Sequence, residues 1–174
     1  MTGNPIPGNE RLIFAMDVPN CDQARALVEE LGDSVIFYKL GLELMMSGSY
    51  FELIEWMLKR NKKVFADLKF FDIPATVGSA VRQLKHRGVS FVTVHGNQSI
   101  MEAAADNKGN DLKVLAVTVL TSLDRGDLKD LGFDCNVETL VVSRARRALE
   151  AGCDGVISSG LEVAMLREHV GSKL

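Results

Sequence analysis

Three charged side chains stand close together in the segment VFADLKFFDIPATVG, which covers residues 64–78. Asp67 and Lys69 end an apolar run that is typical of a strand, and Asp72 follows just after it. Because residues i and i+2 of a strand share one face, we expect Asp67 and Lys69 to point the same way. If Phe65 faces the interior of the fold, both charges line the mouth of a site.

A fourth charge, Lys39, closes the run SVIFYKLG (34–41) and can reach the other three from a neighbouring strand. The set then alternates in sign, which keeps every member ionised because each acid has a cation beside it. A purely structural salt-bridge cluster is the alternative, but desolvation makes buried ion pairs poor stabilisers. Fixed charges in a water-poor site stabilise developing charge, and an ammonium there can donate a proton to a carbanion.

The elements that must position these charges alternate regularly along the chain. Apolar, strand-like runs cover residues 11–18, 34–41, 62–70, 90–96, 112–122 and 153–160. Segments with helical spacing cover residues 21–31, 50–60, 75–88, 99–107, 137–152 and 161–170. Six βα units in succession predict a parallel sheet with helical crossovers.

Two parallel architectures compete, a doubly wound open sheet and a (β/α)8 barrel. The turn after the first strand reads DVPNCD rather than a glycine-rich phosphate loop, and no GxxxxGK[ST] motif occurs. Five strands in succession instead end in polar residues: Asp17, Lys39, Asp67 with Lys69, His95, and Thr121 with Ser122. Barrel enzymes build their sites from the C-terminal ends of several strands, so we predict the TIM (β/α)8 barrel.

The length of the chain fits only part of such a barrel. A barrel has eight units and about 250 residues, whereas this sequence has 174 residues and six units. We predict a single domain over residues 1–174, the N-terminal three-quarters of a barrel, with the last two units missing from this sequence. Residues 1–10, MTGNPIPGNE, are expected to form a disordered or frayed terminus.

Composition excludes several classes of protein. With 47% hydrophobic residues and a net charge of −3, the chain has material for a core and no basic surface for nucleic acid. No apolar run approaches the roughly 18 residues of a membrane span, and no signal peptide is recognisable. Three distant cysteines predict free thiols, a cytoplasmic location and no zinc site.

The segment DLKFFDIPAT, with Asp17 and Lys39 upstream and VTVLTS downstream, strongly resembles the orotidine 5′-phosphate decarboxylases of the bacterial type. The resemblance runs from about Arg11 to Leu174, with weaker matches at VHG (94–96) and ISSGLEV (157–163). It implies a lyase that converts orotidine 5′-phosphate to UMP, the last step of pyrimidine nucleotide synthesis, with no cofactor and no metal.

The resemblance also implies roles for individual residues. Lys69 would protonate C6 of the pyrimidine, with Asp67 against the departing carboxylate. Lys39 would order the charges and contact the ribose, which Asp17 would also bind. The pyrimidine would meet Thr121 and Ser122.

The loop after the third strand has a further implied role, because Asp72, Ile73 and Thr76 would enter the site of a neighbouring subunit in a homodimer. The family's phosphate-binding loops follow strands seven and eight, beyond the six units of this sequence.

Two alternatives stay open at this point. The first is a Mg²⁺-dependent sugar-phosphate decarboxylase or aldolase of the same superfamily. Lys39 argues against it, because these enzymes place a metal-holding acid at that position. The second is a truncated barrel without catalytic activity.

Overall fold

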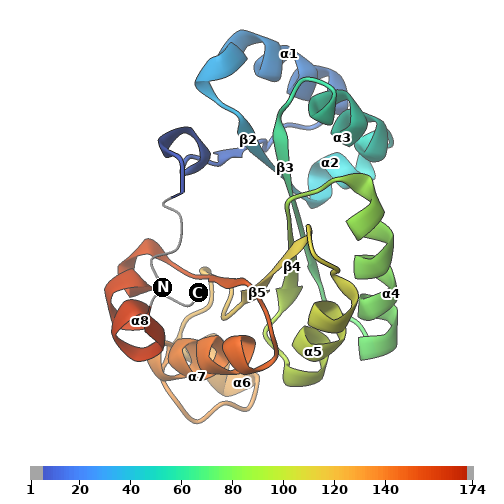
Figure 1. Cartoon of the computed structure of the whole chain (residues 1–174). Coiled ribbons are helices and arrows are strands. Elements are labelled where there is room, and N and C mark those ends of the chain that lie inside the picture. The colour runs from blue at the N-terminus through green and yellow to red at the C-terminus, as the bar shows by residue number, and fades with distance from the viewer. Residues whose placement is uncertain (1–5, 172–174) are drawn as a thin grey trace. The chain divides into compact units, whose positions relative to one another are not determined.

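The computed structural model describes residues 6–171 and contains the predicted alternation of strands and helices (Figure 1). The strands are β1 (Phe14–Ala15), β2 (Phe37–Leu40), β3 (Lys63–Phe70), β4 (Phe91–His95), β5 (Lys113–Val117) and β6 (Gly155–Ile157). The helices are α1 (Cys21–Leu31), α2 (Leu42–Met46), α3 (Tyr50–Leu58), α4 (Pro74–Leu84), α5 (Gln98–Asn107), α6 (Arg125–Asp130), α7 (Val137–Glu150) and α8 (Val163–Val170). Short 3-10 turns are η1 (Gly8–Glu10), η2 (Gly32–Ser34), η3 (Lys85–Arg87) and η4 (Gly160–Glu162).

The order of the strands distinguishes the two predicted architectures. The sheet runs β1-β2-β3-β4-β5-β6, and the pairs β1–β2, β2–β3 and β5–β6 are parallel. A doubly wound sheet reverses its strand order at a switch point, whereas consecutive units of a barrel lie side by side in sequence order. The prediction of a (β/α)8 barrel fold is therefore confirmed, with six of its units in this chain.

The described residues divide into two compact units, and the single-domain prediction stays a prediction. The first unit holds the chain up to Leu68 together with His86–Phe91, and the second holds Lys69–Lys85 and the chain from Val92 onward. Of residues 1–10, predicted to be disordered or frayed, positions 1–5 lie outside the described residues. Within the remainder, Gly8–Glu10 form η1 and the Glu10 carboxylate pairs with Lys63 at 2.6 Å. No helix within residues 6–171 is long and apolar enough to cross a membrane.

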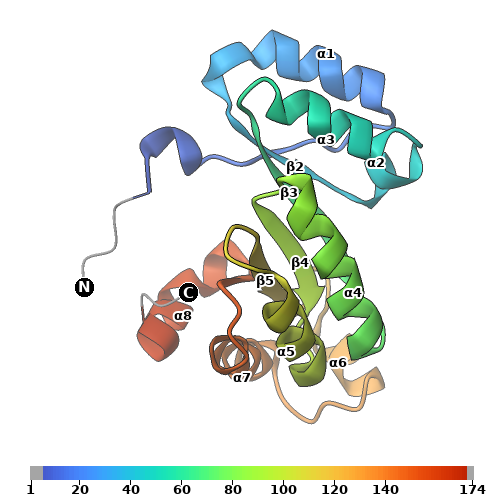
Figure 2. The same cartoon turned by 45° about the vertical axis from the view of Figure 1, so that its right-hand side comes forward.

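An aromatic layer organises the first unit. The ring of Phe91 lies 5.2 Å from that of Phe37 and 5.9 Å from that of Phe65, measured between centroids. Lys39 and Phe65 are register partners in the β2–β3 pair. The helices α1 and α3 lie side by side in both views of this unit (Figures 1 and 2). The layer fixes Phe65 inside the fold, at 4% exposure.

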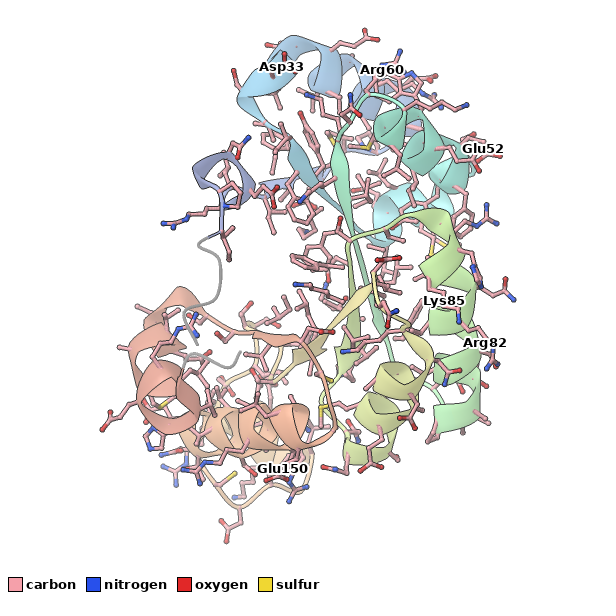
Figure 3. All side chains as sticks on the ribbon, in the orientation of Figure 1. Asp33, Glu52, Arg60, Arg82, Lys85 and Glu150 are labelled. Atoms are coloured by element: carbon pink, nitrogen blue, oxygen red, sulfur yellow. The ribbon has the colours of Figure 1, made fainter. Side chains whose placement is uncertain are left out.

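Close packing of α4 against α5 dominates the second unit (Figures 1 and 2). Gly78 makes this approach possible, because a Cβ there would lie 2.8 Å from Asn107 Nδ2 and 3.2 Å from the Ala103 carbonyl oxygen. Arg82 of α4, labelled in Figure 3, donates to Asn107 Oδ1 at 2.7 Å. Two helices of one layer are thus joined by both packing and hydrogen bonding.

Three segments differ from the prediction. The strand expected over 112–122 ends at Val117, and a turn follows in which Leu123 N donates to the Leu120 carbonyl at 2.9 Å. The helices α2 and α6 were not predicted. They have only five and six residues, too few for helical periodicity to be recognised in the sequence.

A buried lysine joins the start of β3 to the end of α1. The Lys62 side chain is 6% exposed, and its Nζ donates to the carbonyl oxygens of Gly32 (2.5 Å) and Val35 (3.1 Å). Its third partner is Asp33 Oδ1 at 3.4 Å, on the surface residue labelled in Figure 3. Such charge-assisted hydrogen bonds satisfy carbonyls that a helix end leaves without intrahelical partners.

We predict that Lys62→Met lowers the free energy of unfolding by about 2 kcal/mol, the loss expected for buried hydrogen bonds to a charged group. The matched control is Lys63→Met, because Lys63 pairs with Glu10 at 2.6 Å through a side chain that is far more exposed. That variant should lose less than about 1 kcal/mol. Urea denaturation of both variants checks the prediction, and equal losses would contradict it.

Candidate active site

The first unit brings together three of the predicted site residues around one ammonium group. Lys39 Nζ lies 3.4 Å from Asp17 Oδ1 and 3.5 Å from Asp67 Oδ2. Asp17 is exposed just after β1, Lys39 is a half-buried residue of β2, and Asp67 lies on β3. The carboxyl ends of neighbouring parallel strands meet at one edge of a sheet, which explains the meeting of residues so distant in sequence.

Asp67 is the buried member of this group, with 7% of its surface exposed. Phe65, which belongs to the aromatic layer, precedes Asp67 by two residues on β3 and lies on the same strand face. A low-dielectric region therefore adjoins the carboxylate. The Lys39 ammonium offsets the desolvation of that carboxylate. Within residues 6–171, no three His, Cys, Asp or Glu side chains form a group that could hold a metal ion.

Lys69, in the second unit, has a backbone conformation that is rare for its residue type. Its φ angle is +46°, in the left-handed region that costs a non-glycine residue about 1–2 kcal/mol. Its backbone N–H donates to Thr93 Oγ1 at 2.9 Å. Strained residues of this kind concentrate at functional sites, where surrounding structure holds them in place.

His95, at the end of β4, shares the surroundings of Lys69. Its imidazole packs against the Phe71 ring with centroids 4.7 Å apart. Burial lowers the pKa of His95, and the positive charges of Arg144 and Lys69 lower it further. The imidazole is therefore neutral at neutral pH and adds no third positive charge to this region.

The loop between β3 and α4 exposes Asp72 and Ile73 to solvent, and the first turn of α4 exposes Thr76. The Asp72 carboxylate accepts the Ile73 N–H at 2.6 Å, which ties it to its own loop. Pro74 occupies the first turn of α4, where its missing N–H costs nothing, so the loop ends abruptly. The loop is short and stiff at the point where it carries Asp72.

Thr121 and Ser122 lie in an exposed turn after β5 rather than at the end of a strand as predicted. The turn leads to Asp124, whose side chain caps α6 by accepting from Gly126 N and Asp127 N. Thr121 borders a hollow of about 340 Å³ that Leu161 also lines. Both residues therefore lie in an exposed connection and not on a strand.

Sequence reasoning missed two residues of the second unit, Thr93 and Phe71. Thr93 carried a weak signal, since it is a polar residue inside the run FVTVHG and lies two positions before His95, on the same strand face. Phe71 carried none, because an aromatic residue next to Phe70 is indistinguishable from core material. The positive φ of Lys69 was equally invisible in the sequence.

Comparison with known proteins gives consistent matches. Residues 10–174 match the sequence model of the "Orotidine 5′-phosphate decarboxylase / HUMPS family". The orotidine 5′-phosphate decarboxylase of Methylococcus capsulatus is 62% identical over 174 residues, which are all of this chain and 72% of the relative. That of Xanthomonas campestris pv. campestris is 52% identical over 168 residues, or 96% of this chain and 69% of the relative.

A solved structure agrees with these sequence matches. The crystal structure of orotidine 5′-phosphate decarboxylase from Lactobacillus acidophilus superposes with a TM-score of 0.87 at 34% sequence identity. The match covers 94% of this chain and 77% of that one. The fold and the sequence therefore point to the same group of proteins.

The lowered pKa of His95 predicts how stability depends on pH. Below the ordinary histidine pKa of about 6.5, His95 is protonated in the unfolded chain but remains neutral in the folded chain, where its pKa is lower. The free energy of unfolding therefore falls as pH decreases. His95→Gln should remove this part of the loss. Urea denaturation at about pH 7 and pH 5 measures it.

The control for that measurement is His86→Gln, which removes an imidazole from an exposed position of η3. Both variants lose one histidine, so the comparison isolates the effect of the surroundings of His95. An acid-induced loss of stability in His95→Gln as large as in the wild type would contradict the assignment.

Proposed function

Since the chain belongs to the orotidine 5′-phosphate decarboxylase / HUMPS family, we propose that it removes CO2 from C6 of orotidine 5′-phosphate and yields UMP in pyrimidine nucleotide synthesis. The observation that carries this proposal is the buried carboxylate of Asp67 beside the Lys39 ammonium, with Lys69 two residues further along β3. The family match supplies the substrate, and the charges supply a means of performing the reaction.

The chemistry of the reaction explains why fixed charges are needed. Loss of CO2 from C6 leaves an electron pair in the plane of the ring, where the π-system cannot accept it. The protein must therefore stabilise that charge with groups already in place before the reaction. Enzymes lower barriers by roughly 8–23 kcal/mol, and a reaction with no electron sink requires the upper part of that range.

Lys69 is the proposed proton donor. Its ammonium faces the charge that develops at C6 and then neutralises it by proton transfer, which makes the reaction a general-acid-assisted decarboxylation. The strained backbone of Lys69 supports this role, because a fixed position is what a preorganised donor requires.

Asp67 is proposed to lie against the substrate carboxylate, where its charge favours departure of CO2. The ammonium of Lys39 holds Asp67 in place and contacts the ribose, as does Asp17 on the other side of Lys39. Thr121 and Ser122 are proposed to contact the pyrimidine. Their position in an exposed turn is compatible with closing on a ligand.

Lys39 argues against the magnesium-dependent alternative within the superfamily. Its ammonium occupies the space between two carboxylates, Asp17 and Asp67, that a divalent cation would otherwise need. A cation held there would be repelled by Lys39 at close range.

We predict that Lys69→Ala lowers kcat for orotidine 5′-phosphate by at least about a thousandfold, because it removes both the donor and the stabilising charge. The absorbance change from orotidine 5′-phosphate to UMP measures turnover in the whole natural protein. Lys63→Met, on the same strand but paired with Glu10, is the control and should retain activity. Turnover of Lys69→Ala within tenfold of the wild type would exclude Lys69 as the donor.

The active unit is proposed to be a homodimer whose sites are shared. Ile73, 66% exposed, and Phe71 present apolar side chains on the stiff loop that carries Asp72. Exposed apolar residues on a protruding loop fit a protein surface better than water. A second copy would accept the loop symmetrically, since a two-fold interface is self-complementary. Asp72, Ile73 and Thr76 would then complete the partner's site.

A mixture of two inactive variants tests the shared site. Asp72→Ala and Lys69→Ala chains should each be nearly inactive, but a mixed dimer would have one site with both defects and one site with neither. Random pairing of equal amounts should restore roughly a quarter of wild-type activity. Native mass spectrometry would verify that mixed dimers form, and their inactivity would place Asp72 in its own subunit's site.

A reducing compartment, the cytoplasm, is the proposed location. All three cysteines are free, and Cys21 and Cys153 are buried. Burial raises the pKa of the Cys153 thiol to about 12, so this side chain is an unreactive part of the core. Free thiols of this kind are typical of proteins kept reduced.

A further inference from the structure

The strand β4 contributes a fully buried hydroxyl to the neighbourhood of Lys69. Thr93 has no exposed surface, and its Oγ1 accepts the Lys69 backbone N–H at 2.9 Å within the second unit. Both residues lie on strands rather than loops, so the geometry of this contact is set by rigid elements. The flanking residues of β4, Val92 and Val94, are buried as well and leave Thr93 little freedom.

The contact coincides with the one unusual feature of the Lys69 backbone. Extended strand residues have negative φ, whereas Lys69 has a φ of +46°. A rotation of φ turns the amide relative to the side chain, so an acceptor fixed against the amide also determines where the side chain begins. The rule that residues i and i+2 of a strand share one face therefore does not by itself determine where the Lys69 side chain points, but the hydrogen bond to Thr93 can.

We propose that Thr93 is a positioning residue for the decarboxylation, which holds Lys69 in its left-handed conformation and thereby aims the ammonium at the reacting carbon. This inference rests on the proposed function of Lys69. Thr93 acts through the backbone of Lys69 and takes no proton itself. A buried valine in its place would fill the same volume without offering the acceptor.

Three variants of the whole protein separate the hydroxyl from the shape of the side chain. Thr93→Val keeps the branched shape and loses the acceptor, whereas Thr93→Ser keeps the acceptor and loses a methyl group. Tyr38→Phe is the matched control, because it removes another buried hydroxyl, which donates to the Val35 carbonyl at 3.1 Å. Each loses one small feature of the core, but only the first loses the bond to Lys69.

We expect Thr93→Val to lower kcat about tenfold, equivalent to about 1.4 kcal/mol of barrier, with KM changed less than threefold. Thr93→Ser should recover kcat to within about threefold of the wild type, and Tyr38→Phe should lower only the melting temperature. Crystal structures of the Thr93 variants should show Lys69 at negative φ in the valine variant and positive φ in the serine variant.

Each part of the proposal can fail separately. Wild-type turnover of orotidine 5′-phosphate tests the proposed function by itself, before any variant is made. If the wild type turns over, an unchanged kcat in Thr93→Val overturns the inference, as does a lowered kcat with Lys69 still at positive φ. A kcat that falls equally in the valine and serine variants also overturns it, since packing would then explain the loss.

Discussion

The ion pair between Lys39 and Asp67 is the constraint on which the arrangement of the site depends. A carboxylate that is only 7% exposed loses most of its hydration, and an unpaired charge in that position would cost several kcal/mol. The ammonium 3.5 Å away offsets that cost. Lys39 lies within reach of Asp67 only because β2 and β3 are parallel neighbours with Lys39 opposite Phe65. The ion pair therefore depends on the order and register of the strands.

The aromatic layer next to this ion pair strengthens its electrostatic interaction, because it keeps water away from one side. The aromatic layer of Phe37, Phe65 and Phe91 packs in the interior next to the Lys39–Asp67 ion pair. Water therefore cannot approach the ion pair from that side. Electrostatic interactions are larger where water is excluded, and this holds for the transition state as well as for the ion pair. The burial of the Asp67 carboxylate therefore carries a desolvation cost in folding, and in the proposed reaction it would strengthen the effect of that charge on the substrate.

Much of this arrangement could be predicted from the sequence, because it depends on period and order. The βα alternation and the polar strand ends indicated a barrel, and they placed Lys39 and Asp67 at one edge of the sheet. The left-handed φ of Lys69 could not be predicted, since the residue that its backbone N–H contacts, Thr93, is 24 positions away in the sequence. The turn at Thr121 was also missed, because the apolar residues before it continue the strand pattern past the point where the chain bends.

The proposed roles of the site residues differ between strands and loops, because strands are the more rigid elements. Lys39, Asp67 and Lys69 must hold fixed charges before the substrate arrives, and all three lie on strands. Asp72 and Thr121 lie on exposed connections, which are better suited to meeting a ligand or a second chain. The loop that carries Asp72 is more rigid than an ordinary exposed connection, because Pro74 fixes the first turn of α4 immediately after it. In the proposed dimer, a loop that reaches into another subunit would lose less conformational entropy on docking if it is already stiff, so Pro74 would favour that assembly.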